Sequence, residues 1–244
     1  MPVIRPLATT ALSQSTQKDL AKRQKTANKY AANDKRIGNA WKRFSGTPAR
    51  SDVETQLDAA FHSKCAYCEI IVPRDIEHFY PKSKFPDRMF QWTNYLRACK
   101  NCNTEKLDTF DLVNGCPVLL DPCADEPSEF LTWDLDTGLP ILNSAPERHT
   151  RAEATVKMFG LRNQQLCEER RVRARNFLFC LLQSVEENPS PPDVHQWLLD
   201  ELKPERPWRS VLRQIVRDPK RADLIAEVKR TVPEVEPHLA ALAA

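Results

Sequence analysis

Apolar residues recur at helical spacing near the start of the chain. Residues 14–44 are rich in Ala, Lys, Gln and Arg, which favour helix. Trp41 and Phe44 lie three residues apart, as expected of two core residues on one helical face. The pattern predicts a helix over residues 14–44, with an interruption at Gly38, and a second helix that runs towards His62.

The middle of the chain lacks this periodicity. The β-branched run Ile70–Val72 predicts a short strand, and Ile76–Tyr80 predicts a second one. Helical periodicity returns from Thr150, and the Pro-rich stretch Asn188–Pro192 is expected to end a long helix. We therefore expect an N-terminal helical region, a central module, an irregular extension with at most short strands, and a C-terminal helical region. Their bounds are residues 1–60, 61–110, 111–150 and 151–244.

Composition is compatible with a folded cytoplasmic protein. Hydrophobic residues make up 41% of the 244 residues, which is enough for a core. The net charge of +3 does not by itself mark a nucleic-acid binder. No stretch resembles a secretory signal or approaches the ~20 apolar residues of a membrane span, so we expect a cytoplasmic location without membrane contact. Disulfides are rare there, so the eight cysteines are first interpreted as metal ligands or buried thiols.

Four of the cysteines form two tight pairs, Cys65-x-x-Cys68 and Cys99-x-x-Cys102. Two such pairs suit tetrahedral coordination of zinc by four thiolates, which leaves no open position for water. The zinc is therefore expected to be structural. Buried thiols with accidental spacing, a redox dithiol and a zinc ribbon that only binds partners are the alternatives. The sequence assigns no role to the other four cysteines, at positions 116, 123, 167 and 180.

Residues between the cysteine pairs and just after the second pair suit phosphodiester hydrolysis. His78 can act as a base at neutral pH. Asn103 offers a carbonyl oxygen to a hard ion such as magnesium, and Lys106, one helical turn further on, can meet a phosphate. Glu77 is adjacent to His78, so the two side chains leave opposite faces of a regular strand, and both serve one site only if the segment bends.

The same residues resemble a known family. The strings C-A-Y-C-E, I-E-H-F-Y-P-K-S and W-T-N-Y-L-R-A-C-K-N-C-N-T-E-K, within residues 65–106, resemble the HNH endonucleases with a ββα-metal core. More narrowly, they resemble the HNH nuclease subunit of Septu anti-phage systems, the PtuB family, which also occurs with some retrons. The string L-L-D-P at Leu119–Pro122 resembles a further feature of that group.

The resemblance implies a mainly α fold with a small embedded ββα-metal (HNH) zinc module. It makes His78 the general base, and it makes Glu77 and Asn103 the ligands of a catalytic Mg²⁺ or another divalent ion. Many members have Asp where this chain has Glu77. Asn94 would orient the loop that carries the base, and the hairpin would bend so that Glu77 and His78 reach one site. The four paired cysteines match the family's structural zinc site.

The resemblance also implies partners. It suggests an effector nuclease that cleaves nucleic acid, with DNA as the default substrate and tRNA as the alternative. An ATPase subunit resembling PtuA would act with it, joined in retron-linked systems by a retron reverse transcriptase with its DNA. The chain has no G-x-x-x-x-G-K-[ST] phosphate loop, so it is not expected to be the ATPase itself. The competing class is a non-catalytic zinc-binding adaptor that docks on nucleic acid or an ATPase.

Basic residues offer further substrate contacts. Lys82, with Lys84 and Arg88, lies next to the motif and is the best candidate for binding a phosphate. Two basic runs lie elsewhere: Lys18, Lys22, Arg23, Lys25 and Lys29, and then Arg170, Arg171, Arg173 and Arg175. Each run either tracks phosphates or forms an ordinary solvated face.

Overall fold

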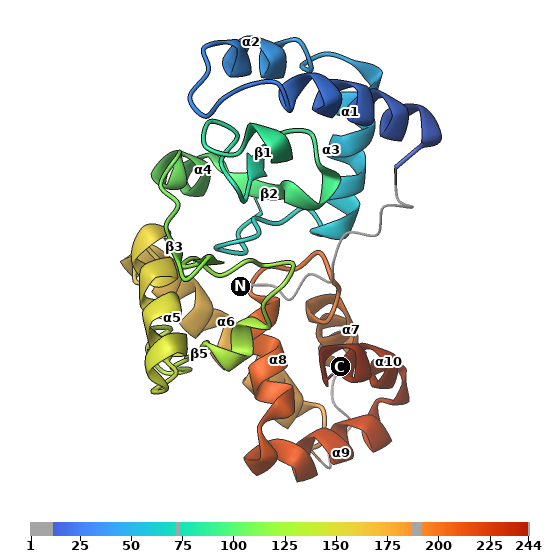
Figure 1. Cartoon of the computed structure of the whole chain (residues 1–244). Helices are drawn as coiled ribbons and strands as arrows, with labels where there is room; N and C mark the ends of the chain where they lie inside the picture. Colours follow the sequence, from blue (N-terminus) through green and yellow to red (C-terminus); the bar gives the residue numbers. More distant parts are fainter. Residues whose placement is uncertain (1–11, 72–73, 187–191, 244) are drawn as a thin grey trace.

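The computed structural model describes residues 12–71, 74–186 and 192–243. The chain forms an upper part, residues 12–106, and a lower part, residues 107–243 (Figure 1). Most of the described residues are helical, with three small two-stranded sheets. The expectation of a mainly α fold is therefore confirmed. Within the described residues, no helix is long and apolar enough to cross a membrane.

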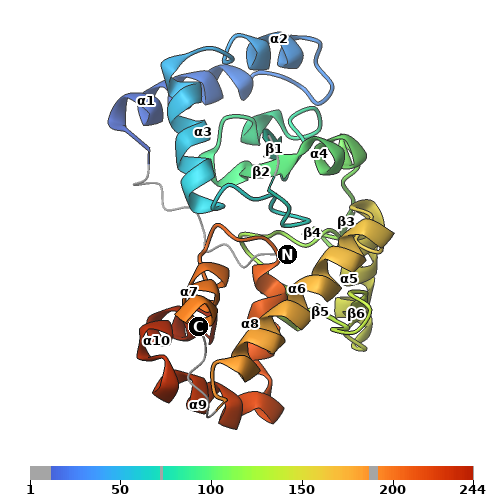
Figure 2. The same cartoon turned by 180° about the vertical axis from the view of Figure 1, so that it is seen from behind.

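The upper part holds a hairpin between helices (Figures 1 and 2). Its elements are α1 (Gln14–Ala27), α2 (Arg36–Lys42), α3 (Pro48–Ala60), β1 (Arg74–His78), β2 (Tyr95–Cys99) and α4 (Lys100–Lys106). β1 and β2 pair antiparallel, from Arg74 opposite Cys99 to His78 opposite Tyr95. Helix α3 packs against β2, and α4 packs against both strands. The hairpin is followed directly by a helix, and its second strand, Tyr95–Cys99, was not among the strands predicted from the sequence.

The N-terminal helices differ from the prediction. The expected helix over residues 14–44 is broken at residues 28–35, and Gly38 lies inside α2 instead of at the break. Ser13 caps α1 by accepting a hydrogen bond from Thr16 N. Helix α3 starts at Pro48, where Thr47 accepts a hydrogen bond from Arg50 N. The helix towards His62 was thus predicted correctly, whereas the single long helix before it was not.

The two strands also differ in their bounds. The first predicted strand does not form, since Ile70 and Ile71 have no strand partner and Val72 lies outside the described residues. The second spans Arg74–His78 instead of Ile76–Tyr80. Successive side chains of β1 alternate between the two faces of the hairpin, which decides where the candidate site residues point.

The lower part begins with an extension that carries two small hairpins, followed by helices. The strands are β3 (Leu112–Val113), β4 (Cys116–Pro117), β5 (Leu131–Trp133) and β6 (Pro140–Leu142). The helices are α5 (Pro146–Met158), α6 (Gln164–Gln183), α7 (Pro192–Glu201), α8 (Arg209–Arg217), α9 (Ala222–Thr231) and α10 (Glu236–Ala243). Helix α6 ends at Gln183, before the Pro-rich stretch that was expected to end it, most of which lies outside the described residues.

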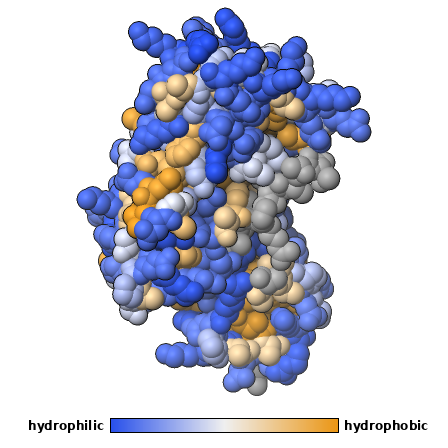
Figure 3. All heavy atoms as spheres, in the orientation of Figure 1, coloured by the Kyte–Doolittle hydropathy of each residue, from blue (hydrophilic) through white to orange (hydrophobic). Residues whose placement is uncertain are grey.

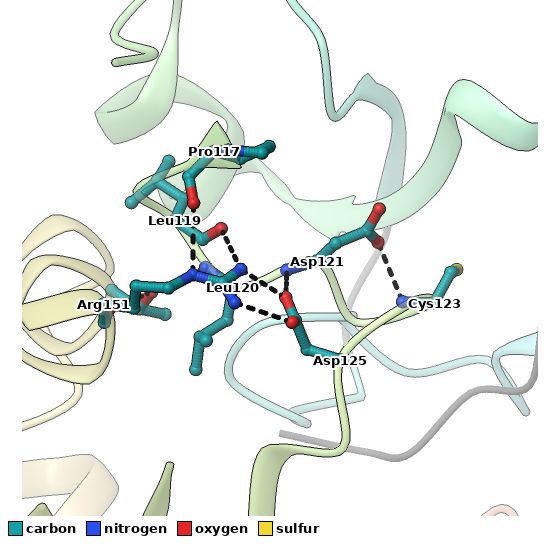
Figure 4. Close-up of polar contacts among 8 residues, drawn as sticks. Pro117, Leu119, Leu120, Asp121, Cys123, Asp125 and Arg151 are labelled. Carbon is teal, nitrogen blue, oxygen red and sulfur yellow. Dashed lines mark hydrogen bonds and ion pairs between the residues drawn. The ribbon is translucent and has the colours of Figure 1, made fainter. Parts of the chain in front are cut away.

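An ion pair and hydrogen bonds hold the extension against these helices. Residues 107–147 contain nine acidic residues and no Lys or Arg. Arg151 of α5 pairs with Asp125 at 2.6 Å and donates to the carbonyl oxygens of Pro117 and Leu119 (Figure 4). The Asp121 side chain accepts a hydrogen bond from Cys123 N in the same loop. The L-L-D-P string thus lies in a loop that Arg151 ties to α5.

The first cysteine pair lies at the junction of the two parts. Lys64 Nζ donates to the carbonyl oxygens of Pro204, at 2.6 Å, and Arg206. The Tyr67 ring stacks on Phe159 with centroids 3.8 Å apart, and Ser210 N donates to the buried carboxylate of Glu69. The segment around Cys65 and Cys68 therefore supports the lower part as well as the hairpin.

Candidate functional site

The four paired cysteines form a candidate metal centre. Cys65 and Cys68 lie in the loop before β1, Cys99 ends β2, and Cys102 lies in the first turn of α4. All four are buried, and their sulfur atoms lie within 4.8 Å of one another. None of the chain's eight cysteines, all of which are described, forms a disulfide. Four clustered thiols are the donor set of a structural zinc site, so the cluster could hold a metal ion such as zinc.

Backbone contacts hold this cluster together. Ala66 N donates to Arg97 O at 2.7 Å, which ties the first cysteine pair to β2. Cys102 N donates to the Cys99 sulfur, which caps α4. Hydrogen bonding to the neighbouring thiols, Cys102 foremost, lowers the pKa of Cys99, so a thiolate is favoured there. A cavity of about 730 Å³ reaches Cys68, Cys99 and Cys102 from the side of α5.

His78 is held in one orientation by its surroundings. Its Nε2 lies 3.0 Å from Met89 O, and the Tyr95 hydroxyl donates to the same oxygen at 3.0 Å. Because a carbonyl oxygen only accepts, Nε2 carries the proton and Nδ1 keeps its lone pair. The Trp41 ring lies edge-on to the imidazole, with centroids 4.5 Å apart. Only 4% of His78 is exposed, and burial lowers its pKa well below the ordinary value, so the ring is neutral at pH 7.

Glu77 points to the opposite face of the hairpin. Its Oε1 lies 2.6 Å from Lys106 Nζ, and the same ammonium donates to His78 O at 2.9 Å. Both side chains are buried, and that of Lys106 is 0% exposed. Burial raises the pKa of Glu77 and lowers that of Lys106, while the ion pair opposes both shifts. A phosphate contact by Lys106 therefore requires that the ammonium first leave Glu77.

The bend implied by the family resemblance is absent from the described strand. β1 pairs regularly with β2 through His78, so Glu77 and His78 remain on opposite faces. Lys106 contacts both residues, because its ammonium pairs with the Glu77 carboxylate and donates to the backbone carbonyl of His78.

Asn94 fixes the segment that follows His78. Its Oδ1 accepts from Tyr80 N at 2.7 Å, and its Nδ2 donates to Tyr80 O and Arg88 O, both at 3.0 Å. Its backbone carbonyl accepts from Phe79 N. The Asn94 side chain is buried, so these bonds hold both ends of the loop between β1 and β2.

Asn103 lies on α4 beside the other carboxylate of β1. Its Nδ2 donates to Asp75 Oδ2 at 3.1 Å near the surface. Asp75 lies two residues before Glu77, so both carboxylates face α4. Two carboxylates and an amide carbonyl offer the oxygen donors that a hard divalent ion prefers. Strand alternation would have found Asp75, which the sequence interpretation missed. Nothing in the sequence placed Trp41 against His78.

The basic candidates differ in their surroundings. Lys82 is partly exposed, with its Nζ 6.0 Å from the centre of the Trp41 ring, and Lys84 is exposed. The second basic run is largely internal. Arg170 is buried between Trp133 and Trp208, Arg173 pairs with the buried Glu201, and Arg171 pairs with Glu168. This run is therefore not a phosphate-tracking surface.

Fold and site together define a mainly helical protein with a hairpin–helix unit fastened by a four-cysteine cluster. No protein-family model matches the chain. The chain is 26% identical to Septu protein PtuB of Bacillus mycoides over 236 residues, which cover 73% of this chain and 79% of that protein. It is 33% identical to Septu protein PtuB of Bacillus thuringiensis over 75 residues, 29% of this chain and 28% of that protein. The expected similarity to PtuB is therefore confirmed.

Proposed function

We propose that the chain is a metal-dependent HNH endonuclease, the effector nuclease of a Septu-type anti-phage system. The observation that carries this proposal is the state of His78. Its Nε2 is committed to Met89 O, so Nδ1 is the basic nitrogen, on a hairpin that the cysteine cluster fastens to α4. A fixed neutral imidazole is what general-base activation of water requires.

Each remaining residue has a role in phosphodiester hydrolysis. His78 takes a proton from water as the water oxygen attacks phosphorus and the bond to the leaving oxygen breaks. Glu77 and Asn103, with Asp75 beside them, would hold Mg²⁺ or another divalent ion. These oxygen donors and the His78 ring lie on opposite faces of the hairpin, so joint action on one phosphate requires the segment at Glu77 and His78 to bend when substrate binds. When bound, the divalent ion supplies positive charge that stabilises the phosphate and the leaving oxygen. Asn94 positions the loop after His78. Lys82 would contact a substrate phosphate.

Lys106 balances the charge of Glu77 before an ion binds. Its ammonium lies between the Glu77 carboxylate and His78 O, the place where a cation is needed. A divalent ion held by Glu77 would compete with Lys106 for the carboxylate, and an ammonium released from Glu77 could then meet the substrate phosphate.

The relatives' name suggests the biological setting. By similarity to PtuB, we infer that the chain acts on DNA or tRNA with an ATPase subunit resembling PtuA. In a retron-linked system, a retron reverse transcriptase with its DNA would be a further component. The test is cleavage of duplex DNA and total tRNA by the zinc-loaded chain, with and without that ATPase, in Mg²⁺, Mn²⁺ or EDTA. Divalent-dependent cleavage is expected.

One observation favours a second candidate, a non-catalytic zinc-binding adaptor. His78 is almost completely covered and Glu77 is paired internally, as in a site that never opens. The adaptor binds nucleic acid or the ATPase and cleaves neither substrate in any divalent ion. The same assay separates the two candidates.

A further inference from the structure

Positive charge is concentrated in the upper part of the molecule. Residues 12–106 contain 18 basic and 10 acidic residues, an excess of eight, although the whole chain has a net charge of only +3. The outer surface of this end is mostly hydrophilic, with long side chains that extend into solvent (Figure 3). The candidate phosphodiester site lies in the same part, so the excess charge is placed where a polyanion would be held.

The basic run on α1 separates into an inner and an outer set. Thr16, Leu20 and Ala27 are the buried face of the helix. Arg23, near that face, pairs with Asp19 at 2.6 Å. Lys18, Lys22 and Lys25 follow the opposite face of α1, and Lys29 continues their spacing in the turn just after the helix ends at Ala27. We call these four residues the lysine stripe.

The lysine stripe is free to bind an external anion. All four side chains are exposed, and none forms an ion pair with any residue in the described part of the chain. No acidic residue occurs between Asp19 and Asp34. By contrast, Arg23, Arg36 and Arg50 each pair with a carboxylate nearby. At about 1.5 Å per residue, the part of the stripe on α1, from Lys18 to Lys25, extends roughly 10 Å.

The lysine stripe faces away from the candidate catalytic site. The buried face of α1 packs on α3 and on the 3₁₀ turn Pro86–Arg88, and Gln24 bonds to Pro86 O and Phe90 N. Side chains half a helical turn away from that face therefore point outward, on the side opposite to His78. A strand held at His78 cannot be the same short segment that contacts the stripe.

We propose that the lysine stripe is a second nucleic-acid contact, which binds the phosphate backbone outside the cleavage site. The inference rests on the proposed function, because a nuclease gives such a contact a purpose. No large apolar side chain lies among the four lysines, so the stripe has neither the apolar centre of a protein interface nor the apolar face of a membrane-binding helix. Regularly spaced lysines without a rigid pocket suit a sequence-independent polyanion.

The test replaces all four lysines of the stripe by Gln and measures binding by fluorescence anisotropy. The probes are a labelled 40-bp DNA duplex and labelled tRNA, in EDTA, at several KCl concentrations. The matched control replaces the four lysines that follow Lys106 in the chain, and so removes the same charge: Lys157, Lys203, Lys220 and Lys229. Circular dichroism and melting temperature verify that both variants fold.

We expect the stripe variant to bind at least tenfold more weakly near 100 mM salt than the wild type or the control. Four lost phosphate contacts should lower the slope of log K against log salt by about 3.6 on B-DNA, at about 0.9 per contact. Cleavage at saturating substrate should keep its kcat, with a raised KM. The proposal would be overturned if the stripe variant matched the wild type in affinity and salt slope on both probes. It would also be overturned if the control variant lost as much affinity as the stripe variant, or if the stripe variant lost only its binding to the ATPase.

The binding assay contains no divalent ion, so it is independent of catalysis. If the stripe variant binds normally while the wild type cleaves, the second contact is wrong and the nuclease function stands. If the stripe variant loses binding but no protein cleaves any substrate, the contact stands and the adaptor function is favoured.

Discussion

Lys106→Met removes the ammonium that compensates the buried carboxylate of Glu77. The side chains of Lys106 and Glu77 are 0% and 5% exposed, so solvent does little to screen the charge that remains. Breaking a buried ion pair by removing one partner costs about 3–5 kcal/mol in the free energy of unfolding. The lost hydrogen bond to His78 O adds about 1 kcal/mol. We therefore expect the variant to lose about 4–6 kcal/mol.

The pH dependence of this loss has a definite sign. Without the ammonium, burial alone acts on Glu77 and raises its pKa further above the ordinary carboxyl value of about 4.3. A carboxyl group with a raised folded-state pKa contributes stability that is present below its unfolded pKa and is lost as pH rises through the folded pKa. The deficit of the variant should therefore be larger at pH 8.5 than at pH 5.5.

Urea unfolding of the zinc-loaded protein, followed by tryptophan fluorescence, measures both quantities. The control is Lys100→Met, at an exposed position on the same helix, which should change stability by no more than about 0.5 kcal/mol. The double variant Glu77→Gln with Lys106→Met should recover part of the loss, because no buried charge remains. A loss below 1 kcal/mol for Lys106→Met, or a double variant no more stable than the single one, would refute the buried ion pair.

Three further predictions concern the metal centre, the loop and His78. Metal analysis should find about one zinc per chain, and Cys99→Ser should lose the zinc and unfold the hairpin. A wild-type protein that is fully folded without metal would contradict a structural role for zinc. Asn94→Ala deletes three side-chain hydrogen bonds, so it should lower the free energy of unfolding by about 2–4 kcal/mol and remove most of the cleavage activity. The control Asn101→Ala, at an exposed position, should change neither stability nor cleavage. By NMR, His78 should titrate well below the ordinary imidazole pKa of about 6.5, because burial lowers its pKa. Trp41→Ala should raise that pKa towards the ordinary value, and an ordinary titration in the wild type would contradict the burial argument.

The cysteine cluster was predictable because its chemistry depends on local spacing. Each C-x-x-C pair brings two thiols together locally, and two such pairs predict one shared metal ion; the structure gathers the same four cysteines. Strand alternation likewise predicted that Glu77 and His78 leave opposite faces, and the structure keeps them there. The bend inferred from the family resemblance was the part that the geometry did not reproduce.

Long-range contacts were not predictable from the sequence. Trp41 meets His78 from a helix 37 positions earlier, and no local pattern encodes that approach. Lys106 looked like a surface cation because Lys is rarely buried, yet a carboxylate on a separate strand holds it inside. The basic run that begins at Arg170 also looks exposed in the sequence, because the tryptophans that cover Arg170 lie far away in the chain, in β5 and just before α8. Burial of a charge depends on partners that only the tertiary structure brings together.

The central claim is that His78 is the base of a nuclease, and single-turnover cleavage tests it most directly. Wild type, His78→Ala and His149→Ala are each loaded with zinc and assayed with the ATPase partner on DNA and tRNA in Mg²⁺. His149 is an exposed histidine on α5, outside the hairpin–helix unit, so its variant controls for the loss of an imidazole. We predict that His149→Ala cleaves like the wild type and that His78→Ala is slower by at least 100-fold, within the usual range of about 10²–10⁴ for a general base. Equal cleavage by the wild type and His78→Ala would contradict the mechanism.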